Sequence, residues 1–183
     1  MTQLTSANQL TLLRVLLIPV FVILVVYAYF GWALIVFATA GLTDALDGVL
    51  ARRSGQKTTL GAWLDPMADK LLLVTTFIVL TLPGLSLANR LPVWLTILII
   101  TRDVLIVSVV AVVNLAVGPR TFRPSIFGKL ATATYIVTAG VALLYNYLGH
   151  ASVVVDVFVF ASLAITLVSG FHYVWHAAWL GEG

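Results

Sequence analysis

Six long apolar segments, separated by short polar stretches, divide the chain. They lie at about residues 12–30, 32–53, 60–82, 91–117, 126–148 and 153–175. Each is near the ~20 residues that a helix needs to cross a bilayer core. Because lipid offers the backbone no hydrogen-bond partner, each segment is interpreted as a helix. The pattern predicts an all-α integral membrane protein with six transmembrane helices. It forms a single domain, residues 1–183, in which residues 1–11 are a short interfacial segment.

Composition agrees with membrane residence. The chain is 61% hydrophobic, only 9% of its residues are charged, and its mean hydropathy is +1.09. Soluble domains carry about a quarter charged residues, so this composition excludes that class. The chain has no cysteine, which excludes disulfides and thiolate metal ligands.

The basic residues fall in two clusters between apolar segments: Arg52, Arg53 and Lys57, then Arg120, Arg123 and Lys129. Clustering in alternate loops is the positive-inside pattern, and it argues against a nucleic-acid partner despite a pI of about 9.5. The second and fourth segments should therefore end in the cytoplasm. With six spans, both termini are then cytoplasmic, as in a bacterial-type inner membrane.

Four of the seven acidic residues lie close together in the second and third segments: Asp44, Asp47, Asp65 and Asp69. The first two are three positions apart and the last two are four apart, so each pair shares a helix face. The short loop between these helices predicts antiparallel neighbours whose pairs point at each other. Four converging carboxylates repel, so either some are protonated or cations lie among them. Two divalent cations would balance the charge, and oxygen ligands suit Mg²⁺, Mn²⁺ or Ca²⁺.

Glycines and an arginine accompany these carboxylates. Gly48 follows Asp47, and Gly61 lies one helical turn before Asp65. A missing side chain lets a bulky ligand approach the helix backbone. The Arg52 guanidinium is suited to a phosphate. The group indicates a site for a metal-bound pyrophosphate with a flat headgroup, in which two ions would neutralise a phosphoryl group and activate a hydroxyl.

The stretch resembles the signature of the CDP-alcohol phosphotransferase family, and the likeness covers nearly the whole chain. Asn8 to Arg14, followed by Pro19, resembles the family's entry into its first span, and the six-span plan agrees. Eight signature positions match at their fixed spacings: Asp44, Asp47, Gly48, Ala51, Arg52, Gly61, Asp65 and Asp69.

The resemblance implies an activity and a set of roles. Family members transfer a phosphatidyl group from CDP-diacylglycerol to an alcohol and release CMP, generally as homodimers with a site open to the cytoplasm and the lipid. Asp44, Asp47 and Asp65 would bind two Mg²⁺ or Mn²⁺ ions. Asp69 would join the metal shell and act as general base. The CDP-binding residues would be Gly48, Ala51, Arg52, Thr58 and Gly61.

The acceptor is expected to bind basic residues outside the signature, namely Arg102, Arg123 and Lys129. Residues 101–104 (Thr-Arg-Asp-Val) and Arg123-Pro124-Ser125-x-x-Gly128-Lys129 resemble the cardiolipin synthase branch, whose acceptor is phosphatidylglycerol. The phosphatidylglycerophosphate synthase branch, whose acceptor is glycerol 3-phosphate, shares Gly128-Lys129. It usually has glutamate where this chain has Asp103. We favour phosphatidylglycerol and keep glycerol 3-phosphate as the alternative.

Other readings of the same residues stay open. The four aspartates could form a cation pathway in a transporter. Arg102 and Asp103 could be a structural pair, each meeting another helix because adjacent residues do not face each other. Lys70 could have no role beyond neutralising local charge.

Overall fold

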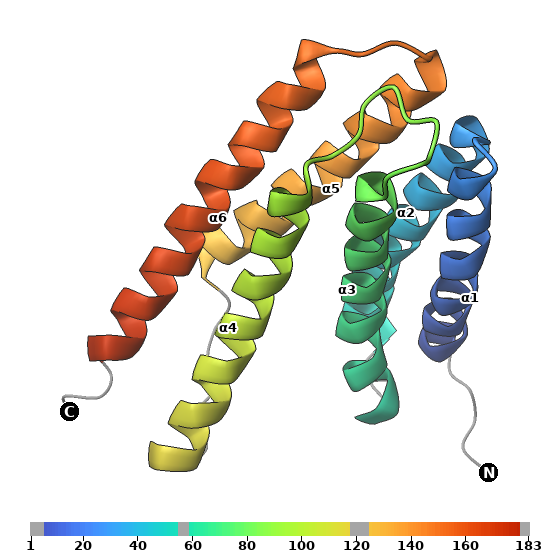
Figure 1. The fold of residues 1–183 in the computed structure, drawn as a ribbon. Coiled ribbons are helices and arrows are strands. Elements are labelled where there is room, and N and C mark those ends of the chain that lie inside the picture. The colour runs from blue at the N-terminus through green and yellow to red at the C-terminus, as the bar shows by residue number, and fades with distance from the viewer. Residues whose placement is uncertain (1–5, 55–58, 118–124, 180–183) are drawn as a thin grey trace.

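Six helices make up the computed structural model, which describes residues 6–54, 59–117 and 125–179 (Figure 1). Side chains are not described at 6–11, 44–54, 59–67, 69, 110, 111, 113, 114, 116, 117 and 174–179. The helices are α1 (Ser6–Val26), α2 (Phe30–Ser54), α3 (Thr59–Thr81), α4 (Val93–Val117), α5 (Ile126–Leu148) and α6 (Val153–Trp179). The all-α prediction is confirmed, and α5 matches its predicted segment residue for residue. Helix α1 runs unbroken from Ser6 to Val26, four residues short of the predicted end of the first apolar segment, and Phe30 already begins α2. An interfacial position for residues 1–11 stays a prediction.

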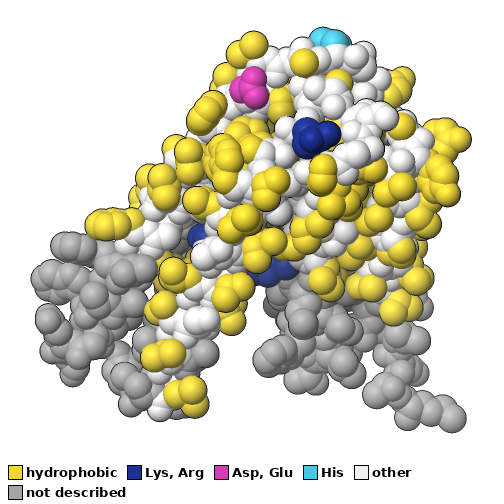
Figure 2. Space-filling model, viewed as in Figure 1, with side chains coloured by type: hydrophobic (Ala, Val, Ile, Leu, Met, Phe, Trp, Pro, Cys, Tyr) yellow, Lys and Arg dark blue, Asp and Glu magenta, His cyan; other side chains and the backbone are white. Residues whose placement is uncertain are grey.

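The outer surface of the bundle is apolar. Large side chains that are more than half exposed include Leu16, Ile35, Ile97 and Phe160, and Figure 2 shows hydrophobic side chains spread over the whole described face. A protein in water rarely exposes so large an apolar surface. Helices α5 and α6 are both long and apolar enough to cross a membrane, while the described parts of α1, α2 and α3 hold shorter apolar runs.

The helices pack so that a core forms where α1, α2, α3 and α5 meet. Helix α1 lies against both α2 and α3, α2 also packs on α5, and α6 packs on α5 and α4. Phe21, Phe37 and Phe77 are buried in this core together with Tyr135. The predicted direct packing of α2 on α3 is at most slight in the described residues, because α1 lies against each of them.

An amide lock joins the loop before α4 to the turn after α5. The Asn89 backbone N–H donates to Asn146 Oδ1 at 2.8 Å, and Asn146 Nδ2 donates to the Asn89 carbonyl at 3.1 Å. Asn89 also donates to the His150 carbonyl and accepts from the Ser152 backbone N–H. Helix α5 ends just before this turn, at Gly149 with a φ of 75°, where glycine is favoured. The lock stabilises the end of the bundle that lies farther from Asp44–Asp69. The candidate site lies at the other end.

Candidate active site

The signature positions lie on two helices. Helix α2 carries Asp44, Asp47, Gly48, Ala51 and Arg52, and α3 carries Gly61, Asp65 and Asp69. The side chains at these eight positions, and all of Thr58 and Arg123, lie outside the described residues. What the structure supplies is continuous helical backbone through both aspartate pairs, so their spacings of three and four do place each pair on one helix face.

A central cavity of about 420 Å³ lies directly beside the signature. Leu42 in its wall is two residues before Asp44, and Lys70 in its wall follows Asp69. Five helices contribute to the wall, which is mostly apolar. The lining residues are Arg14 from α1; Phe37, Ala38, Ala40, Gly41 and Leu42 from α2; Lys70, Leu72 and Leu73 from α3; Arg102 and Asp103 from α4; and Thr132, Tyr135 and Ile136 from α5.

The charged groups that line this cavity are mostly basic. Arg14 is fully buried at 1% exposure, the Arg102 side chain is 10% exposed, and the Lys70 side chain is half-exposed. Asp103 is the one acidic residue among the described lining residues. Three cations and one anion give the described wall a formal charge of +2. Arginine and lysine side chains in such a wall are suited to binding a phosphate.

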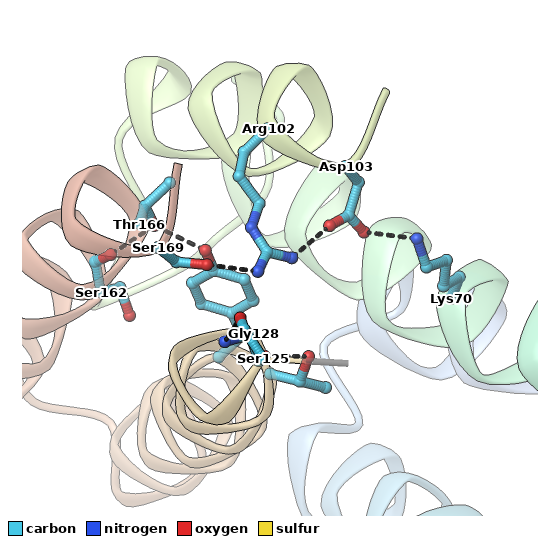
Figure 3. Close-up of polar contacts among 10 residues, drawn as sticks. Lys70, Arg102, Asp103, Ser125, Gly128, Ser162, Thr166 and Ser169 are labelled. Carbon is cyan, nitrogen blue, oxygen red and sulfur yellow. Dashed lines mark hydrogen bonds and ion pairs between the residues drawn. The ribbon is translucent and has the colours of Figure 1, made fainter. Parts of the chain in front are cut away.

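Asp103 connects two of these cations (Figure 3). Its Oδ1 accepts from Arg102 Nη1 at 2.8 Å, and its Oδ2 lies 3.2 Å from Lys70 Nζ. Arg102 Nη2 donates to Ser169 Oγ on α6 at 2.6 Å. The expectation that Arg102 and Asp103 do not face each other is wrong, because the long arginine side chain folds back to its neighbour. The expectation that each also meets another helix is confirmed, through Ser169 and Lys70.

Gly128 makes room for the Arg102 guanidinium. A Cβ atom at position 128 would lie 3.3 Å from Arg102 Nη2 and 3.3 Å from Ser125 Oγ. Ser125 caps the start of α5 by accepting from the Gly128 backbone N–H. Lys129, the next residue, is exposed and is not among the residues that line the cavity. Of the three predicted acceptor residues, Arg102 is thus the one that the structure describes at the cavity.

Three residues join the cavity or its network that the sequence did not single out for acceptor binding: Arg14, Lys70 and Ser169. Arg14 belongs to the first-span pattern, and Lys70 directly follows Asp69, so both carried a signal by position. Ser169 carried none, because a serine in an apolar helix has many structural roles and only the packing of α6 on α4 brings it to Arg102.

Known proteins resemble this chain over most of its length. The profile of the CDP-alcohol phosphatidyltransferase family matches residues 4–175. The chain belongs to this family. A probable phosphatidylglycerophosphate synthase of Mycobacterium tuberculosis is 38% identical over 177 residues, covering 92% of this chain and 79% of that protein. The human cardiolipin synthase (CMP-forming) is 35% identical, covering 78% and 52%, and that of Streptomyces coelicolor is 34% identical, covering 90% and 77%.

Membership confirms the family resemblance and makes the protein a phosphatidyltransferase of phospholipid biosynthesis. CDP-alcohol phosphatidyltransferases are membrane enzymes that use a divalent metal, and this decides between an enzyme and the cation transporter in favour of the enzyme. Relatives from both acceptor branches are similar to the chain at nearly the same identity, 38% and 34–35%. Identity alone therefore does not choose the acceptor.

Proposed function

We propose that this phosphatidyltransferase joins the phosphatidyl group of CDP-diacylglycerol to a hydroxyl of phosphatidylglycerol, forming cardiolipin and CMP. The acceptor oxygen attacks the phosphorus that carries the diacylglycerol, the bond from that phosphorus to the CMP oxygen breaks, and the hydroxyl proton passes to the Asp69 carboxylate. The observation that supports a phosphate-bearing acceptor is the cationic wall, centred on Arg102, of the cavity whose lining residue Lys70 directly follows Asp69. An acceptor phosphate held there would keep its free hydroxyl near the base.

The acidic positions fit a pair of divalent ions. Asp44 and Asp47 lie on one face of α2, and Asp65 and Asp69 on one face of α3, in unbroken helices. Carboxylate oxygens are the ligands that Mg²⁺ and Mn²⁺ prefer. These residues would hold the ions, which when bound would neutralise the donor pyrophosphate. The protein's own part is to position the donor through Gly48, Ala51, Arg52, Thr58 and Gly61, and to hold the acceptor proton on Asp69.

Acceptor binding is assigned to Arg102, Arg123 and Lys129, with Arg14 and Lys70 as further cations of the cavity. The sequence around Arg102 and from Arg123 to Lys129 favours phosphatidylglycerol. Glycerol 3-phosphate is the second candidate, supported by the 38% identity to the mycobacterial relative. Both acceptors are glycerol phosphates, so the cationic wall suits either, and the difference lies in whether acyl chains are also bound.

The proposed setting is a six-span homodimer, a single domain over residues 1–183, with the site and both termini at the cytoplasmic face. Charge placement in the sequence supports this orientation, because the two basic clusters fall in or beside the stretches that follow α2 and α4. The opposite end exposes Tyr27, Tyr29, Trp32 and Tyr147, as the second interface of a bilayer requires.

The test supplies the purified protein with CDP-diacylglycerol and either phosphatidylglycerol or glycerol 3-phosphate, in separate reactions. CMP and the lipid product are identified by mass. We expect cardiolipin from the first reaction, loss of CMP release on chelation, and recovery with Mg²⁺ or Mn²⁺. Phosphatidylglycerophosphate from the second reaction alone would transfer the assignment to the other acceptor. CMP release that persists after chelation contradicts the metal assignment.

A further inference from the structure

Arg102 borders two hollows and not one. Besides the central cavity, it lines an apolar groove of about 580 Å³ between α4 and α6, here called the α4–α6 groove. Its walls are Trp94, Ile97, Leu98 and Leu105 from α4, and Leu167 and Phe171 from α6. Because the mostly buried Arg102 lines both spaces, an occupant of the groove can place a polar group near this residue.

The shape and chemistry of the groove suit a single hydrocarbon chain. Trp94 and Leu105 are eleven residues apart along α4, which is about 16 Å at the rise of a helix. That length is about half the ~30 Å thickness of a bilayer core, the depth of one leaflet. The hydroxyl of Thr166, one of the few polar lining groups, is bonded to Tyr135 at 2.6 Å. The lining therefore offers mainly apolar contact, with one cation.

One N–H donor of the Arg102 guanidinium, at Nε, has no hydrogen-bond partner among the described residues. This nitrogen is buried, while Nη1 and Nη2 are bonded to Asp103 and Ser169. A buried donor on a charged group is costly unless an acceptor meets it. Nε is closed off from both spaces in this arrangement, so a phosphate oxygen would meet it only after the guanidinium turns away from Asp103 or Ser169. A ligand that has a phosphate at one end and a long apolar chain at the other accounts for the groove and for Arg102 together.

We propose that the α4–α6 groove binds an acyl chain of the acceptor lipid, with the acceptor phosphodiester at Arg102. The inference rests on the proposed function and deepens it, because it selects phosphatidylglycerol over glycerol 3-phosphate, which has no chain to fill the groove. The donor lipid is assigned elsewhere. Its pyrophosphate belongs with the aspartates of α2 and α3, and neither α4 nor α6 carries a signature residue.

Gly170 allows the groove to be filled without disturbing the fold. It lines the groove, and a Cβ at this position meets no atom within 4 Å. We expect Gly170→Leu to raise KM for phosphatidylglycerol roughly tenfold, through the apolar contact that the lipid loses, and to leave KM for CDP-diacylglycerol within about twofold. Ala161→Leu is the matched control, because Ala161 is exposed on α6 and is not among the groove residues. A rise in KM for the donor, or no rise for either lipid, overturns the proposal.

A binding measurement decides the same question without turnover. Phosphatidylglycerol carrying a photoreactive diazirine in one acyl chain is irradiated with the full-length protein, and the labelled residues are mapped by mass. We expect enrichment at 94–105 and 166–171 that unlabelled phosphatidylglycerol competes away and phosphatidylcholine does not. Gly170→Leu should remove the enrichment and Ala161→Leu should keep it. Labelling spread evenly over the lipid-facing helices contradicts the proposal that the α4–α6 groove binds the acyl chain. Enriched labelling of the groove without CMP release from either acceptor would support lipid binding in the groove and contradict the proposed function.

Discussion

Asp103 on α4 and Lys70 on α3 form an ion pair, with 3.2 Å between Asp103 Oδ2 and Lys70 Nζ. Lys70 directly follows Asp69, the proposed base, and Asp103 also holds the Arg102 guanidinium. One carboxylate therefore links the helix that carries the base to the cation proposed to bind the acceptor.

Asp103→Asn should impair acceptor binding and also lower stability. The pair with the half-exposed Lys70 contributes at most about 1 kcal/mol, but the mostly buried Arg102 loses its carboxylate partner, so the melting temperature should fall. Loss of the charge frees Lys70 and Arg102 to shift, and KM for phosphatidylglycerol should rise roughly tenfold with a smaller fall in kcat. Steady-state CMP release checks this. Asp156→Asn, on the exposed first turn of α6, is the control and should behave as wild type. An equal fall in kcat at unchanged KM contradicts the positioning role.

Gly128→Ala should separate activity from stability. The added methyl would lie 3.3 Å from Arg102 Nη2, so the guanidinium must move by a few tenths of an ångström. Alanine favours a helix over glycine by up to about 1 kcal/mol, so thermal stability should hold or rise while KM for the acceptor increases.

Gly140→Ala is the matched control for this change on the same helix. There the nearest atom to an added methyl is Phe37 Cε1 at 4.0 Å, an ordinary contact. It should give a comparable gain in stability and leave the kinetics unchanged. If both variants have wild-type kinetics, Gly128 serves the helix and not Arg102.

The sequence predicted the helices well because each apolar run has one way to satisfy its backbone in lipid. It predicted the carboxylates because charge inside an apolar chain is conspicuous, and their spacing of three and four residues assigns each pair to a helix face. Arg102 was found for the same reason. That Asp103 meets another helix was predicted, but its partner Lys70 and the direct contact with Arg102 were not, because they depend on α3 lying against α4 and on an arginine folding back to its neighbour. Ser169 and the α4–α6 groove were missed because they arise only from the packing of α6 on α4.

Asp69→Asn should abolish turnover and keep the fold. An amide cannot take up the acceptor proton, and general base catalysis contributes about 10²–10⁴-fold to a rate. CMP release should fall by at least that lower bound, while the melting temperature and elution volume stay those of the wild type. Asp69→Glu keeps a carboxylate at a longer reach and should retain part of the activity. Full activity in the asparagine variant would remove Asp69 from the role of base.

Asn146→Leu should lower stability with little effect on the chemistry. Asn146 is 3% exposed and satisfies both the N–H and the carbonyl of Asn89, at the end of the bundle away from the signature. Leucine leaves two buried backbone groups unpaired, each at a cost of about 1–3 kcal/mol. The melting temperature in detergent should fall by several degrees, while kcat and KM measured well below it stay near wild type. Asn146→Asp keeps the acceptor for the Asn89 N–H but sets a buried carboxylate against the Asn89 carbonyl, so its melting temperature should fall as well. A large loss of activity at full folding would show that the lock controls the site across the length of the helices, through α5 and the residues that α5 contributes to the cavity wall.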